Sequence, residues 1–433
     1  MNEFISLEEI IIDKIKEFKT SRAYREMIEG EKYYNADLED KLYHSFFKQI
    51  VDEKVDYLFT NNYSLTADNQ NNLINIQKIL GNQFNLLLKR LAKECSKKGK
   101  AWLHVYYDDQ EQIKMRMIKA EEVIPLYNTE NEEELEGIIR FYNEEVYIHK
   151  EKKTLTRVEY WTREDVNFYI LEDEHKLILD SEKYLDEDYE GHYRKGNRAY
   201  TYPEIPFILF RNNEEERNDL IHIKPLIDSY NKNRLHLDTL LDEVREHLYL
   251  LKGYGGADKK EFIEDLKKYG LVLLDDEGDL KYLTPNIDVN ALEIHINKLK
   301  KDIFTIGQST DFTDENNFNQ SGIALKIKFR NLDLKANHIE LYFKEAFQHL
   351  MKFLLIEDQN IEIHFTRQVL VNELELIQAI KESKATGIVS DETLMSKHPY
   401  ITNILQEKEK VKREREEKFK MYDFTTKEES LNE

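Results

Sequence analysis

The first hundred residues have the hydrophobic period of α-helices. Apolar residues recur every three or four positions over 6–30, 41–59 and 72–98, which predicts three amphipathic helices. Ser6 and Glu9 have the spacing of a capping box, in which each side chain accepts a hydrogen bond from the other residue's backbone N–H. We therefore expect a helical start to the chain.

Between about residues 100 and 210 the pattern changes to that of β-strands. Short strand-like segments alternate with charged turns, which is typical of an antiparallel meander. The predicted strands are 101–107, 113–118, 135–142, 146–148, 154–161, 167–171, 176–179 and 202–210. Residues 180–200 are polar and are predicted to form a loop.

The pattern returns to helix after residue 211. A long helix is predicted over 225–251 and another over 289–306. Between them lies a small unit, predicted as a helix at 258–269 followed by a hairpin of 271–274 with 280–283. Two helices with a small inserted unit are therefore expected here.

A polar segment separates the helix that ends at 306 from a longer one. Residues 308–320 are rich in amides, hydroxyls and acids and contain no Lys or Arg. Ser321 can cap a helix that continues to about 356, which would be roughly 54 Å long. The remaining predicted elements are a strand at 361–365 and helices at 372–384, 391–396 and 401–419. The fold class expected is α+β and rich in helix.

Composition narrows the class of protein. The chain has 433 residues, enough for two or three domains, and a net charge of −22, which argues against tight wrapping of nucleic acid. The single cysteine, Cys95, excludes an internal disulfide and a multi-cysteine zinc site, and we expect it to be buried or inert. No secretory signal is visible, and no apolar run approaches the roughly 20 residues of a membrane span.

Catalytic motifs are absent from the sequence. It has no P-loop, HExxH or GxSxG pattern, and no cofactor is expected. Asp311, Asp314 and Glu315 could be imagined as a metal-dependent nuclease cluster, although all three lie on one loop. The thirteen histidines, among them His104 and His364, stand singly and are expected to be ordinary core or surface residues.

Five segments stand out by their order and spacing along the chain: 46–59, 99–106, 205–207, 225–231 and 321–326. Their order resembles that in the portal proteins of tailed bacteriophages, in the group named after the Bacillus phage SPP1. The resemblance spans about 30–417, and no single motif in it is as specific as a Walker box.

The resemblance implies a ring-forming portal fold with wing, stem, clip and crown. Its boundaries in this chain would be a wing at 1–210, a stem helix at 211–251, a clip at 252–286, a second stem helix at 287–307, a tunnel loop at 308–320, a long wing helix with a closing strand at 321–370, a crown at 371–421 and a flexible tail at 422–433.

The resemblance also implies site residues. The tunnel loop would line a DNA channel, and Gly307 and Gly322 could act as its hinges. The expected loop residues are Gln308, Ser309, Thr310, Asp311, Asp314, Glu315, Asn316, Asn317, Asn319 and Gln320. Lys298, Lys300 and Lys301 could line the stem channel or pair with acids of a neighbouring helix.

The function implied is that of a non-enzymatic portal at one vertex of the capsid. Double-stranded DNA would pass through a ring, commonly of twelve copies, during packaging and ejection. The expected partners are the terminase large subunit, the head–tail adaptor, and the major capsid and scaffolding proteins, with no membrane. The protein would be assembled in the host bacterial cytoplasm and end in the virion. The alternatives are a metal-dependent nuclease and a helical scaffold or adaptor without a channel.

Overall fold

The computed structural model describes most of the chain in two compact units. The first comprises Met1–Asp311 and Asn331–Gln368, and the second Phe312–Arg330 and Val369–Glu433. The residues described are 6–36, 43–108, 110–131, 134–148, 151–183, 191–195, 198–245, 248–252, 279–283, 289–311, 322–354, 361–367, 373–401 and 406–414, with single helical positions at 260, 264, 268 and 404.

The first predicted helix is two helices. α1 (Leu7–Thr20) and α2 (Arg22–Asn35) meet at Ser21, whose backbone is extended with φ −66° and ψ 158°. Ser21 serves both ends, because its N–H donates to the Phe18 carbonyl and its hydroxyl accepts from the Tyr24 N–H. The capping box predicted at the start of α1 is confirmed.

The other two predicted N-terminal helices are also shorter than expected. α3 (Phe46–Phe59) begins at residue 46 rather than 41. The helix expected over 72–98 is interrupted at Gly81, which has φ +67°, and forms α4 (Gln70–Leu80) and α5 (Phe84–Lys98).

A five-stranded antiparallel sheet has the order β4-β5-β6-β7-β8. Its strands are β4 (Val123–Tyr127), β5 (Leu135–Ile148), β6 (Glu151–Trp161), β7 (Val166–Glu172) and β8 (Lys176–Leu179). β4 was not predicted, and the two strands expected at 135–142 and 146–148 are one. Buried isoleucines of α1 pack against this sheet.

A second sheet packs against α5. Its order is β11-β2-β3, formed by β11 (Phe207–Arg211), β2 (Lys100–Tyr107) and β3 (Ile113–Ile118). β9 (Tyr193–Lys195) and β10 (Arg198–Tyr200) form a hairpin inside the segment predicted to be loop. β1 (Ser64–Thr66) pairs with β14 (Glu362–His364), so residues almost 300 positions apart meet.

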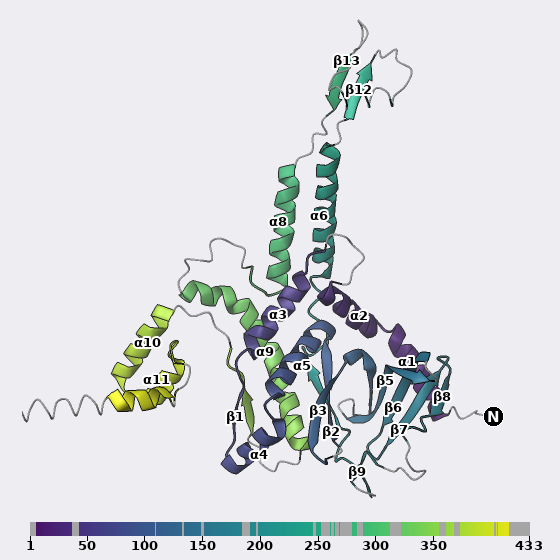
Figure 1. Ribbon diagram of the computed structural model, residues 1–433, viewed down its shortest axis with the longest axis vertical. Coiled ribbons are helices and arrows are strands. Elements are labelled where there is room, and N and C mark those ends of the chain that lie inside the picture. The colour runs from purple at the N-terminus through teal and green to yellow at the C-terminus, as the bar shows by residue number, and fades with distance from the viewer. Residues whose placement is uncertain are drawn as a thin grey trace, which may run out of the picture. The chain divides into compact units, whose positions relative to one another are not determined.

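Two helices pack side by side and continue into a hairpin. They are α6 (Lys224–Arg245) and α8 (Val289–Ile306), and Figure 1 shows the hairpin of β12 (Leu248–Lys252) and β13 (Asp279–Leu283) at their far end. The prediction of a continuous helix to 251 is therefore wrong. β13 pairs with β12, while the predicted partner strand at 271–274 lies outside the described residues, as does most of the predicted helix at 258–269.

The long helix is confirmed as α9 (Gly322–Phe353), which has 32 residues. Its Phe343, Phe347 and Leu350 are fully buried in the main core of the first unit. In the second unit α10 (Glu373–Thr386) packs against α11 (Asp391–Lys397), and residues 406–414 of the predicted charged helix are helical.

Candidate functional site

The end of α8 turns the chain into the predicted tunnel loop by a Schellman motif. The Ser309 N–H donates to the Phe304 carbonyl at 3.0 Å, and the Gln308 N–H donates to the Thr305 carbonyl at 3.3 Å. Gln308 has φ +54°, the left-handed conformation that this motif requires. The helix end is therefore closed by the chain's own backbone bonds.

Gly307 lies one residue before the left-handed position. A Cβ built there would lie 2.8 Å from the Ile50 Cδ1 and 2.7 Å from the Ile303 carbonyl oxygen. A larger residue would therefore have to displace the tip of the Ile50 side chain and would crowd the α8 backbone at Ile303, so the glycine is favoured by space and not by a positive φ. Whether it also acts as a hinge stays a prediction.

Glu53 of α3 holds the first residues of the loop. Its carboxylate oxygens accept from the Thr310 N–H at 3.2 and 3.1 Å, and the Ser309 and Thr310 hydroxyls also donate to it. Thr310 is only 3% exposed. The Glu53 carboxylate thus accepts from three donors: the Thr310 N–H and the two hydroxyls. It takes the place of the backbone partners that a helix or strand would provide.

The neighbouring residue on α3, Lys54, is fully buried in an ion cluster. Its ammonium lies 2.9 Å from Asp219, which precedes α6, and Lys335 of α9 lies 3.3 Å from the same carboxylate. The Lys335 ammonium also donates to the Gly307 carbonyl at 2.9 Å. The cluster therefore joins α3, the segment before α6, α9 and the end of α8.

The charges of this cluster are unequal, because two lysines share one carboxylate. Burial alone would raise the pKa of Asp219, but Lys335, Lys54 and the Asn212 amide lower it to about 2. Burial lowers the pKa of Lys54, and Asp219 offsets this only in part because Lys335 opposes it.

Helix α3 also packs against α6 and against the end of α8. The Phe46 ring of α3 meets Tyr230 of α6 edge-on at 4.8 Å and Phe304 of α8 at 5.7 Å. Residues 46, 50, 53 and 54 of α3 thus contact the α6–α8 pair, its preceding segment or the loop. We call the following residues together the loop anchor: Phe46, Ile50, Glu53, Lys54, Asp219, Ser309, Thr310 and Lys335.

The remaining predicted site residues are placed as follows. The Lys300 ammonium lies 3.3 Å from the Asp311 carboxylate, so this lysine pairs with the loop of its own chain. Lys298 and Lys301 are exposed on α8, and Gly322 is the first residue of α9. The residues outside the described part of the chain are Asp314, Glu315, Asn316, Asn317, Asn319 and Gln320.

The other chemical expectations concern metals, histidine and cysteine. Within the described ranges no group of three or more His, Cys, Asp or Glu residues could hold a metal ion. His104 is buried, which lowers its pKa well below the usual value, and its ring nitrogen lies 3.2 Å from the Pro206 carbonyl oxygen. Cys95 is buried, as predicted.

Glu53, Lys54, Asp219 and Lys335 were missed by the sequence analysis. A signal for Lys54 existed, since it lies on the apolar face of α3 between Val51 and Val55. No comparable signal marked Asp219, which lies in a charged segment.

Comparison with known proteins identifies the family. A family described as "Phage portal protein, SPP1 Gp6-like" matches residues 12–420. The portal protein of Clostridium phage phiCD119 is 32% identical over 399 residues, covering 87% of this chain and 84% of that protein. The portal protein of Bacillus phage SPP1 is 25% identical over 383 residues, covering 86% and 75%.

Among solved structures, a chain in the neck of an empty GTA particle matches with a TM-score of 0.49 and 10% identity, covering 85% of this chain and 92% of that one. From the sequence matches, the protein belongs to the SPP1 Gp6-like family of phage portal proteins, and its function is that of a phage portal protein. None of the helices in the described part of the chain is long and apolar enough to cross a membrane.

Proposed function

We propose that the protein forms a ring whose central channel conducts double-stranded DNA during packaging and ejection. The observation that carries the proposal is the loop anchor: a polar segment leaves the end of α8 with its first residues held by Glu53, while Lys335 holds the carbonyl of the preceding Gly307. A segment that lines a channel has to begin from a fixed position, because passing DNA exerts force on it.

The charge of the segment supports the same role. Residues 308–320 contain three acids and no Lys or Arg, and the one acid described, Asp311, is paired with Lys300. Such a surface avoids the counterion release by which lysine and arginine bind phosphates tightly. DNA would therefore pass without adhering to the channel.

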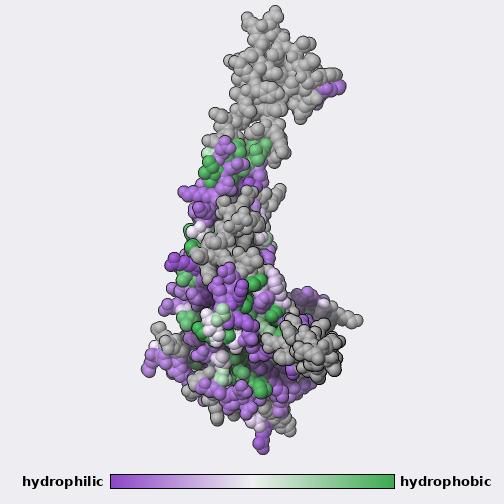
Figure 2. Space-filling view, turned by 90° about the vertical axis from the view of Figure 1, so that its left-hand side faces the viewer, coloured by the Kyte–Doolittle hydropathy of each residue, from purple (hydrophilic) through white to green (hydrophobic). Residues whose placement is uncertain are grey.

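Exposed apolar side chains on the α6–α8 pair support assembly into a ring. Leu235 and Leu241 of α6 are 44% and 42% exposed, and Ile294 and Ile306 of α8 are 70% and 50% exposed. Figure 2 shows apolar patches among the polar ones along this part of the first unit. Neighbouring copies in a ring would cover them.

The proposed parts follow the predicted boundaries. Residues 211–251 and 287–307 would be the stem, 252–286 the clip that docks the terminase large subunit and later the head–tail adaptor, and 371–421 the crown. A dodecamer at the capsid vertex, assembled in the host cytoplasm with capsid and scaffolding proteins, would act as a structural component, not an enzyme.

Negative-stain electron microscopy and mass photometry of the purified protein test this proposal. Rings with a central hole are expected. Leu241→Glu with Ile294→Glu should reduce the ring fraction, whereas the matched exposed pair Lys153→Glu with Lys381→Glu should not. Monomers at every salt and protein concentration, also in the presence of scaffolding protein, would contradict the proposal.

A further inference from the structure

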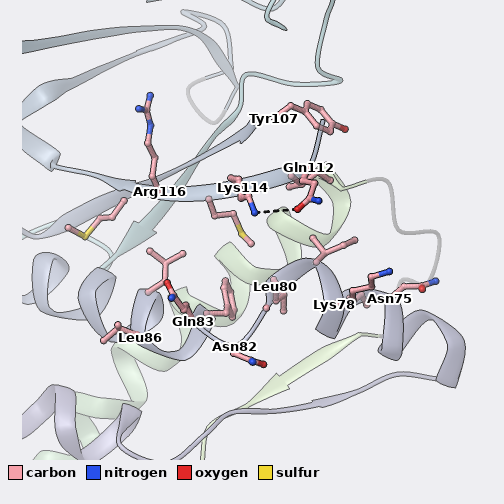
Figure 3. A pocket seen from close by; sticks show the side chains of 18 of the residues that line it. Asn75, Lys78, Leu80, Asn82, Gln83, Leu86, Tyr107, Gln112, Lys114 and Arg116 are labelled. Carbon is pink, nitrogen blue, oxygen red and sulfur yellow. Dashed lines mark hydrogen bonds between the residues drawn. The ribbon is translucent and has the colours of Figure 1, made fainter. Parts of the chain in front are cut away.

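A groove of about 1540 Å³ opens beside β3 in the first unit. Figure 3 shows its two sides: side chains of β3 on one, and side chains of α4, α5 and the turn between them on the other. The groove contains none of the loop anchor residues. It is therefore separate from the site described above.

The strand that borders the groove is at the edge of its sheet. The strand order is β11-β2-β3, and within the described residues β3 pairs with β2 alone. Alternate backbone N–H and C=O groups of an edge strand point away from the sheet and can pair with an added strand. The groove provides the space for a strand beside β3.

The side chains of β3 alternate in character. Ile113, Met115 and Met117 are half-buried and pack against the main core, while Lys114 and Arg116 are exposed. In an antiparallel or parallel sheet, side chains opposite one another lie on the same face. A strand added to β3 would thus place apolar residues toward α4 and α5 and the alternate residues beside the two cations.

The other residues that line the groove, like those of β3, include both basic and apolar side chains. Lys78 and Arg90 lie on the helical side, and Glu111 is the one acid among the described residues that line the groove. Leu86, on the same side, is 48% exposed. In a chain of net charge −22, a groove whose described lining has four cations and one carboxylate favours an acidic partner.

Nucleic acid fits the groove less well than a peptide. Phe84 is only 1% exposed, and the ring of Tyr107, which also lines the groove, already packs against Tyr193 and Tyr202. The exposed backbone of β3 is instead suited to pair with another backbone. Methionines at positions 115 and 117 provide adaptable apolar contacts for side chains of a peptide.

We propose that β3 and the adjoining groove bind an extended segment of a partner protein, in which acidic and apolar residues alternate, as a fourth strand of the β11-β2-β3 sheet. The apolar residues face α4 and α5, and the acids lie beside Lys114 and Arg116. Main-chain hydrogen bonds supply affinity, and the alternation supplies specificity. The proposal does not depend on DNA conduction.

The test uses the full chain and a fluorescein-labelled peptide of alternating valine and glutamate, with binding followed by fluorescence anisotropy. We expect binding by the wild type and roughly tenfold weaker binding after Lys114→Glu with Arg116→Glu, because two attractive cross-strand pairs become repulsive. Lys78→Glu with Arg90→Glu, on the helical side that the apolar residues of the peptide face, should weaken binding less than the β3 variant does. The matched control is Lys153→Glu with Lys381→Glu, at exposed positions elsewhere.

Three further probes separate the explanations. The same peptide N-methylated at every residue should lose binding, because none of its N–H groups can then donate to the edge of β3. Alternating valine and lysine should not bind. The proposal is overturned if the N-methylated peptide binds equally, if a fluorescein-labelled oligothymidine binds more tightly, or if the wild type does not bind the first peptide. One further outcome would overturn the proposal: the variant Lys114→Glu with Arg116→Glu is folded by circular dichroism but no longer forms rings. A second copy of this chain, and not another protein, would then fill the groove.

Discussion

At the scale of single residues, the loop anchor depends on a few polar groups in an apolar setting. Glu53 and Lys54 are consecutive on α3, yet one binds the loop and the other the buried carboxylate of Asp219. Consecutive residues on a helix point about 100° apart, so one helix can contact two partners. A buried or half-buried carboxylate with several donors is costly to remove, because each donor loses its partner.

Glu53→Gln should therefore loosen the loop anchor. The amide offers one acceptor oxygen in place of two, so we expect a loss of about 1–3 kcal/mol in the free energy of unfolding. Hydrogen exchange at the Thr310 amide should become faster. Glu17→Gln, at an exposed position of α1, is the control and should change neither quantity. Unchanged protection of the Thr310 amide would contradict the assigned contact.

At the scale of elements, helix packing in the first unit depends on close backbone approach. A Cβ built on Gly30 of α2 would lie 1.9 Å from the Lys97 carbonyl oxygen of α5. No side chain fits that distance, so α2 and α5 contact each other through their backbones. The α-helical period alone does not show which glycine has this role.

Gly30→Ala should separate the two helices. Overpacking of this kind costs about 1–3 kcal/mol, which outweighs the better helix propensity of alanine. Urea denaturation followed by tryptophan fluorescence measures the effect, since Trp102 and Trp161 both lie in the first unit. Asn75→Ala, on the exposed side of α4, also improves helix propensity but overpacks nothing, so it should not lower the midpoint. If Gly30→Ala instead raised the midpoint of urea denaturation, the backbones of α2 and α5 could not be in direct contact at Gly30.

At the scale of the whole molecule, buried ion pairs connect segments that are distant in sequence. Burial opposes ionisation of Glu31 on α2, but Lys97 and Lys98 of α5 lower its pKa from 4.5 to about 2. Asp219 has a similarly lowered pKa, from 3.8 to about 2. Both carboxylates therefore bind protons more weakly in the folded state than in the unfolded state.

Stability should consequently fall in acid. Because the folded pKa values are lowered, this contribution is fully present above about pH 4.5 and is lost as the pH falls toward 2. The midpoint of urea denaturation, measured by tryptophan fluorescence between pH 6 and pH 2, should decrease over that window. Glu31→Gln should reduce the slope, while Glu174→Gln, an exposed control, should not. A flat profile would contradict the assigned ion pairs.

The sequence by itself determined the helical and strand periods, the capping box at Ser6, the buried Cys95 and the long α9, because each follows from neighbouring residues. It did not determine the breaks at Ser21 and Gly81, since the apolar pattern continues across both. Leu248–Lys252 was mistaken for helix because its strand state depends on pairing with Asp279–Leu283, some thirty residues away.

Tertiary structure alone decided the loop anchor. Glu53 meets Ser309 and Thr310 across more than 250 positions, and Lys54 and Lys335 meet at Asp219 from three separate segments. Local propensity carries no information about such pairs, because their energy arises only when burial removes water from the charges and leaves them each other as partners.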